Sequence, residues 1–238
     1  MANPMAYAHV VFIEGDQGSG KNTVAVARMV DKTFANVTSI KLEDSRIIKA
    51  TPTNPPMVGR VKIWLPNREP FIAKVPPKSC VIADSVKIYS NFHLYGIRAS
   101  FMPLDAMIEY LNEGYINNAY VVCDEHYIGG STLRTMSNLV STIGDLGFQM
   151  RKRHVEFMML APYKRLVGYR NRSIVTEHII CSYDEEKLEV TITVQKKGIR
   201  GSRTYPPFYA PYYWPYFNTD ELIKIPETQI GKALASAR

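Results

Sequence analysis

The chain of 238 residues is 46% hydrophobic and 21% charged, a composition typical of a globular protein rather than a largely disordered one. Its length suits one domain with an ample core. The net charge of +7 at pH 7 favours a polyanionic partner, but charge alone does not decide, because many basic proteins bind no nucleic acid.

Sequence patterns argue against two further classes of protein. No apolar run approaches the roughly twenty residues of a transmembrane helix, and the start MANPMAYAHV lacks the regions of a signal peptide. Cys80, Cys123 and Cys181 are widely spaced without a CxxC pair, which indicates reduced thiols rather than disulfides or a zinc site. We therefore expect a protein that is not secreted and has no transmembrane segment.

A glycine-rich stretch, GDQGSGKNT, follows the apolar run from His9 to Ile13. After it, Val26, Val30 and Phe34 recur at helical spacing. Strand, GxxxxGK loop and helix together predict a P-loop, whose backbone N–H groups and Lys bind the phosphates of ATP. The predicted nucleotide-binding residues are Gly15, Asp16, Gln17, Gly18, Ser19, Gly20, Lys21, Asn22 and Thr23.

One position departs from the P-loop pattern, which places Ser or Thr after the Lys to bind Mg²⁺. Here Asn22 follows Lys21, and Thr23 comes one residue later. An amide oxygen is an acceptable Mg²⁺ ligand. The sequence leaves three alternatives open: Asn22 binds the metal, Thr23 does so through a small shift, or the site is weakened.

A Pro- and Asn-rich segment at 49–78 interrupts the regular pattern after the first helix. Its β-like runs, Val58 to Leu65 and Phe71 to Val75, flank a Pro-Asn-Arg turn and predict an inserted β-hairpin arm. Trp64 is either an exposed interaction point on this arm or, as is more common for Trp, packed on the core.

A second apolar run, Ala119 to Cys123, ends in Asp124 and Glu125. A buried parallel strand followed by this pair is what the other half of a P-loop site needs: Asp124 for Mg²⁺ and Glu125 for the attacking water. The separation of the two motifs predicts that their strands are neighbours, with other elements inserted between them. A surface acidic pair is the alternative.

Basic residues precede a third apolar run, Val155 to Ala161. Arg151 and Arg153 either reach a γ-phosphate, in their own or a neighbouring subunit, or form a solvated turn. Further along, the runs 174–183 and 188–195 flank an acidic turn and predict a hairpin. The loop beyond it carries four predicted DNA-binding residues or is merely a solvated linker; these residues are Lys196, Lys197, Arg200 and Arg203.

Aromatic residues alternate with proline from Tyr205 to Phe217. Such rings either stack on nucleic-acid bases or, more commonly, form a strap over a core edge or a subunit interface. We interpret 205–238 as a C-terminal strap and tail on a single ATPase domain spanning 1–238.

Several of these segments together resemble the FtsK-HerA superfamily of P-loop ATPases. The resemblance rests on GDQGSGK, SNFHL, VVCDEH and QMRKRHVEF, with FNTDE after the aromatic stretch. Small viral genome-packaging ATPases are the branch that looks closest, with the related Zot-like proteins. The resemblance implies an α/β, RecA-like fold in which helices flank a mostly parallel central sheet.

The resemblance also implies a function. Such proteins hydrolyse ATP with Mg²⁺ as homo-oligomeric rings, expected to be hexamers, and move double-stranded DNA through the ring. Arg151, or failing that Arg153, would be the arginine finger. A polar sensor, often Gln, is expected after the third strand, but Ala161 and Pro162 stand there. A virion or portal protein would then be a partner, and the host cytoplasm or the virion the location.

Three alternatives to a packaging motor remain. A Zot-like secretion ATPase usually carries a transmembrane segment, which this sequence lacks. A nucleotide kinase shares the P-loop, but the Asp-Glu pair favours activation of water. A P-loop scaffold that has lost hydrolysis would account for Asn22 and Pro162.

Overall fold

The protein is described by a computed structural model, which places residues 9–124, 150, 152–163 and 173–218. Two predicted catalytic residues, Glu125 and Arg151, lie outside these ranges. Within the placed ranges, no helix is long and apolar enough to cross a membrane.

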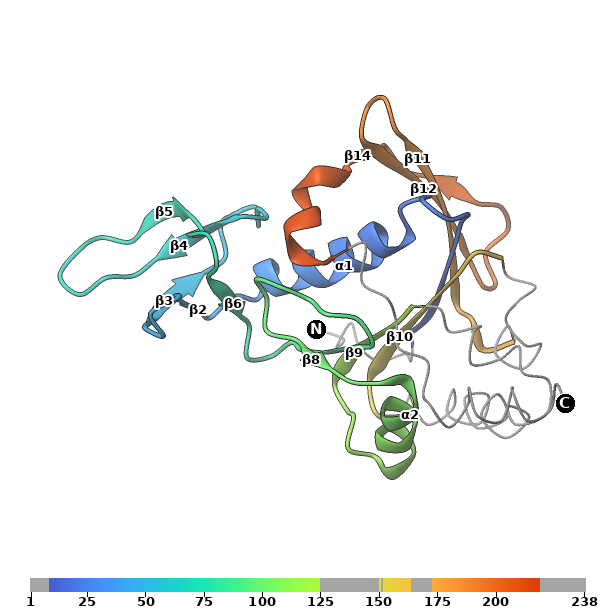
Figure 1. Ribbon diagram of the computed structural model, residues 1–238, viewed down its shortest axis with the longest axis horizontal. Helices are drawn as coiled ribbons and strands as arrows, with labels where there is room; N and C mark the ends of the chain where they lie inside the picture. Colours follow the sequence, from blue (N-terminus) through green and yellow to red (C-terminus); the bar gives the residue numbers. More distant parts are fainter. Residues whose placement is uncertain (1–8, 125–149, 151, 164–172, 219–238) are drawn as a thin grey trace, which may run out of the picture.

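Five parallel strands form the centre of the main sheet (Figure 1). In spatial order they are β11 (Glu177–Asp184), β1 (His9–Glu14), β10 (Val155–Ala161), β9 (Ala119–Cys123) and β7 (Lys87–Ser90). Numbered by their order in the chain, they run 5-1-4-3-2. The short strand β8 (Ser100–Phe101) extends the sheet beside β7, also in parallel.

The prediction that β1 and β9 are neighbours is wrong. β10 lies between them, with Phe157 opposite Val10 on one side and Val121 on the other. β10 can occupy this central place because its side chains are buried on both faces.

The far edge of the main sheet is antiparallel. β12 (Glu189–Lys196) pairs with β11 as the predicted hairpin, and the short strands β13 (Arg203–Thr204) and β14 (Phe208–Tyr209) pair with β12. The fold is therefore that of an α/β P-loop NTPase of the RecA-like type, as predicted, with a mostly parallel sheet.

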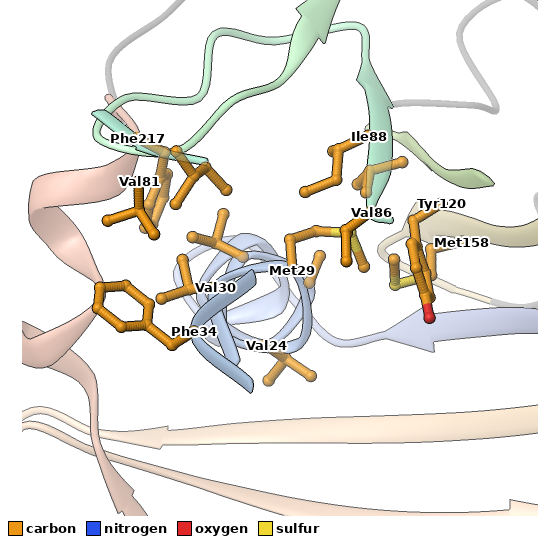
Figure 2. Packing of buried hydrophobic residues seen from close by; sticks show 14 of the residues in the cluster. Val24, Met29, Val30, Phe34, Val81, Val86, Ile88, Tyr120, Met158 and Phe217 are labelled. Atoms are coloured by element: carbon orange, nitrogen blue, oxygen red, sulfur yellow. The ribbon is translucent and has the colours of Figure 1, made fainter. Parts of the chain in front are cut away.

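Within the residues that the structure places, one helix packs on each face of the parallel strands. α1 (Lys21–Ala35) lies on one face, where Met29, Val30 and Phe34 pack into a core with side chains of the sheet (Figures 1 and 2). α2 (Leu104–Glu113) packs into the core on the other face and ends at Gly114, which takes the left-handed conformation, φ 86°, that is common after the last turn of a helix.

A buried ion cluster fixes α1 to the sheet. The Arg28 guanidinium donates to Glu177 at 2.5 Å and to Glu156 at 3.1 Å. Burial disfavours the charge on Arg28, but the two carboxylates outweigh it and hold the guanidinium pKa above its usual value. These ion pairs link the helix that follows the P-loop to β10 and β11.

A second, smaller sheet contains the predicted arm and projects from the body of the molecule (Figure 1). The predicted hairpin is present as β4 (Arg60–Ile63) and β5 (Phe71–Lys74). Three further strands complete the order β5-β4-β3-β2-β6: β2 (Ser39–Lys41), β3 (Ile47–Thr51) and β6 (Cys80–Ile82). The insertion is thus larger than 49–78 and begins four residues after α1.

The aromatic and proline-rich stretch lies along α1 (Figure 1). It forms two 3₁₀ turns, η3 (Ala210–Tyr212) and η4 (Trp214–Tyr216). The Tyr216 ring meets Phe34 edge-on, and Phe217 is buried beside Val81 in the same core (Figure 2). This part of the chain covers the core under α1, whereas Tyr212 and Trp214 remain exposed.

Candidate nucleotide-binding site

The glycine-rich loop joins β1 directly to α1. Gly18 and Gly20 have φ of 78° and 85°, a region that side chains other than glycine rarely adopt. A Cβ at Gly20 would also lie 2.7 Å from the Val190 side chain. The loop conformation therefore requires glycine at this position.

The start of α1 is suited to an anion. Gly20 is the N-cap, and no side chain of the placed residues caps this end of the helix. The first-turn N–H groups and the positive end of the helix dipole therefore face the loop. Lys21 adds a cation there, with its ammonium donating to the carbonyls of Gly15 at 2.6 Å and Asp16 at 2.7 Å.

The two halves of the predicted site meet in the structure. Asn22 Nδ2 donates to the Asp124 carboxylate at 2.6 Å, linking the first turn of α1 to the end of β9. Thr23 is instead buried within α1, with 5% of its surface exposed. Of the two candidates for the metal, only Asn22 contacts Asp124.

The donor set at this contact fits Mg²⁺. A carboxylate and an amide oxygen are both hard oxygen ligands, which this ion prefers. Asp124 and Asn22 would supply them from the acid-bearing strand and from the helix after the P-loop. The remaining positions around such an ion are normally filled by water and by the nucleotide phosphates.

A further residue, Asn91, holds the backbone of Asp124. Its Oδ1 accepts from the Asp124 N–H at 2.8 Å, and its Nδ2 donates to the Asp124 carbonyl at 2.9 Å. Asn91 follows β7 and is buried. Sequence reasoning quoted the SNFHL segment without giving Asn91 a role, because its partner is distant along the chain.

A polar pair that sequence reasoning missed lies at the base of the P-loop. His178 Nε2 is 2.6 Å from Glu14 Oε2, and the His178 ring also contacts Phe12. Glu14 is the last residue of β1 and lies opposite Ala161 in β10. Ala161 is buried, so the position where the resemblance expects a polar sensor carries no polar side chain.

Arg153 lies far from the phosphate site of its own subunit. It precedes β10, at the end of the sheet opposite the P-loop, and its guanidinium donates to the carbonyls of Leu111 and Asn112. These are among the last carbonyls of α2, which a cation stabilises. The structure therefore corrects the interpretation that Arg153 reaches a γ-phosphate within its own subunit.

The predicted DNA-binding loop also lies at the end of the sheet opposite the P-loop. All four of its cations are on exposed residues. Lys196 is 3.8 Å from Glu177, and Lys197 donates to the Ser173 carbonyl at 2.7 Å. Arg203 stacks over the Tyr205 ring at 4.9 Å. Within the placed residues, three of the four cations thus have contacts inside the chain.

Comparison with known proteins shows only that the fold of this chain is similar to folds that are already known. No known protein family and no curated protein matches the sequence. The N-terminal domain of zonular occludens toxin from Neisseria meningitidis is similar, at 14% identity and TM-score 0.49, over 89% of this chain and 100% of that domain.

Two further solved structures are similar at comparable levels. A KaiC-like protein, PH0186, from Pyrococcus horikoshii OT3 has 14% identity and TM-score 0.42, over 84% of this chain and 82% of its own. The RadB recombinase has 8% identity and TM-score 0.45, over 83% and 87% of the two chains. At such values, function has to be inferred from this chain's own residues.

Proposed function

We propose that this protein is an ATP hydrolase that moves double-stranded DNA, and that it works as a homo-oligomeric ring in viral genome packaging. The observation that carries hydrolysis is the 2.6 Å contact between Asn22 and Asp124. It joins the P-loop to Asp124, and the next residue in the chain, Glu125, is the one to which we assign activation of water.

Each group then has a defined task. The loop N–H groups and Lys21 bind the β- and γ-phosphates, and Lys21 exchanges its loop carbonyl acceptors for phosphate oxygens. Asp124 and Asn22 hold Mg²⁺, which supplies charge neutralisation at the phosphates. Glu125 accepts a proton from the attacking water. Asn91 keeps Asp124 fixed from the side of β7.

DNA as the substrate of motion is supported by charge and by the resemblance of the sequence motifs to FtsK-HerA ATPases. The chain carries +7, and Lys196, Lys197, Arg200 and Arg203 lie on exposed residues of one loop. In a ring, Arg151 would supply the cation that stabilises the γ-phosphate of a neighbouring subunit. A portal protein of the virion is the expected docking partner.

The first test is steady-state ATP hydrolysis with and without linear double-stranded DNA. We expect stimulation by DNA in the unaltered protein. Lys21→Ala should lose nucleotide binding, and Glu125→Gln should bind ATP but not hydrolyse it. Lys32→Ala, an exposed cation on the same helix as Lys21, is the matched control and should behave like the unaltered protein.

Other results of the ATP hydrolysis assay would favour other functions. Hydrolysis that ignores DNA would exclude the translocase and leave an ATPase with another partner. ATP binding without any hydrolysis would favour a nucleotide-bound scaffold, a candidate that the absence of a polar side chain at Ala161 supports.

A further inference from the structure

The small sheet has two different faces. Val61 and Ile63 of β4 and Ala50 of β3 point inward and join the core under α1. The alternate residues point the other way, since side chains along a strand alternate between faces. We call this second side the outer face; it comprises Lys49, Thr51, Arg60, Lys62, Trp64, Ile72 and Lys74.

Strand register places these outer residues side by side. Arg60 lies opposite Lys74, and Lys62 lies opposite both Ile72 and Thr51. Trp64 continues β4 beside Lys49, whose carbonyl accepts the Trp64 N–H at 3.0 Å. Four cations therefore share one face, at steps of about 5 Å across strands and about 7 Å along them.

The charge of the whole chain is concentrated on this sheet. Residues 39–82 contain eight Lys or Arg and three Asp or Glu, a net +5 of the chain's +7. β3, β4 and β5 contain no Asp or Glu at all. Two of the three acidic residues form ion pairs with cations outside the outer face: Asp44 with Arg46, and Glu43 with Lys78.

Trp64 lies between cationic side chains of the outer face. Trp64 is 40% exposed, so the sequence-based alternative that it packs on the core is wrong. The ammonium groups of Lys49 and Lys62 lie 5.5 and 5.6 Å from its ring centre, and its Nε1–H donates to Thr51. These contacts hold the ring in place among the cations.

We propose that the outer face of the small sheet binds nucleic acid, separately from the nucleotide site. A regular array of cations matches a linear polymer whose charges repeat, and Trp64 with the 60% exposed Ile72 offers apolar contact to sugars and bases. The inference shares its partner with the proposed function but requires neither ATP hydrolysis nor a ring. The candidate loop at Lys196 to Arg203 lies on the other sheet.

The test compares two triple variants of the full chain. Arg60→Gln, Lys62→Gln and Lys74→Gln together remove three charges from the outer face. Arg46→Gln, Lys78→Gln and Arg98→Gln remove three exposed charges from residues that lie outside the strands of this sheet, and serve as the matched control. Binding of single- and double-stranded oligonucleotides of one sequence is measured over a range of salt concentrations.

We expect the outer-face variant to lose roughly a hundredfold in affinity at low salt. The slope of log K against log salt should fall by about 2 to 3, because each lost phosphate contact removes about 0.7 for single strands and about 0.9 for duplex. The relative loss on the two forms identifies which one the face prefers. Equal losses in both triple variants, or none in either, would overturn the proposal.

Tryptophan fluorescence gives an independent readout, since the chain has only two Trp residues. In a Trp214→Phe background, Trp64 is the sole reporter, and we expect oligonucleotides to quench it. Equal quenching by polyglutamate or by anionic lipid vesicles would show a general polyanion or membrane surface and contradict the proposal. ATP hydrolysis without DNA should be unchanged in the outer-face variant. The experiment therefore distinguishes failure of the proposed ATPase function from failure of the proposed nucleic-acid surface.

Discussion

Two amide side chains hold Asp124 from opposite sides. Asn22 contacts its carboxylate from α1, and Asn91 contacts its backbone from the end of β7. A carboxylate that must bind a metal needs such supports, because orientation by neighbouring groups governs metal affinity. Neither Asn carries a charge, so both position Asp124 without competing with the cation it would hold.

Replacement of Asn22 tests its part in the metal site. Asn22→Ser restores a hydroxyl in the usual P-loop position and should keep Mg²⁺-dependent ATP binding, whereas Asn22→Ala should weaken it roughly 10- to 100-fold. The measurement is ATP affinity as a function of Mg²⁺ concentration. Without Mg²⁺, ATP affinity should be the same in the two variants. If Mg²⁺ raised the ATP affinity of both variants equally, the assignment of Asn22 as a metal ligand would be contradicted.

Asn91→Ala removes both hydrogen bonds to Asp124. We expect a loss of roughly 1–3 kcal/mol in the free energy of unfolding, because the part-buried N–H and carbonyl of Asp124 lose their hydrogen bonds to Asn91. Urea denaturation measures the loss. Asn91→Asp keeps the acceptor for the Asp124 N–H but sets an oxygen against the carbonyl, so it should not restore stability.

Among the elements that the structure places, α1 takes part in both the site and the packing around it. It begins at the P-loop, carries Asn22, is bound to β10 and β11 through Arg28, and contacts η4. Tyr213 adds a bond from this aromatic segment, its hydroxyl donating to Asp31 at 3.1 Å. The position of the phosphate-binding turn therefore depends on contacts well away from it.

Arg28→Met should destabilise the fold by roughly 3 kcal/mol near pH 7, since it removes the guanidinium that binds the Glu156 and Glu177 carboxylates. Without Arg28 the pKa values of Glu156 and Glu177 should rise above their unfolded values. The deficit should then shrink as the pH falls through those raised values, because protonation removes negative charge that Arg28 no longer neutralises. Urea denaturation of the variant and the unaltered protein near pH 7 and at acidic pH measures the difference in the free energy of unfolding. A difference that grows in acid would contradict the prediction.

Sequence predicts the local elements of this fold better than their arrangement. The loop at Gly18 and Gly20, the helix after it and the hairpin β4–β5 all follow from turn residues and periodicity. The place of β10 between β1 and β9 does not, because an apolar run looks the same beside any neighbour. Asn91 was missed for the same reason: its role exists only once β7 and β9 are paired.

In the whole molecule, the one predicted finger residue that the structure places, Arg153, lies away from the nucleotide site of its own subunit. Arg153 binds the last carbonyls of α2. We propose that Arg151 acts from a neighbouring subunit. We expect ATP hydrolysis per subunit to rise with protein concentration, because subunits must assemble to complete the site. Arg151→Ala should abolish the rise, whereas Lys152→Ala should not. A rate per subunit that is independent of concentration would contradict the ring.

The course of α1 has a mechanical consequence. This helix starts at the phosphate-binding loop and ends four residues before β2, the first strand of the small sheet. At 1.5 Å per residue it is about 22 Å long, so a tilt of about 5° at its first turn moves its far end by about 2 Å. Because the projecting sheet extends further still, α1 would act as a lever that magnifies small displacements at the γ-phosphate. Hydrolysis at the P-loop would thus displace the outer face of the small sheet.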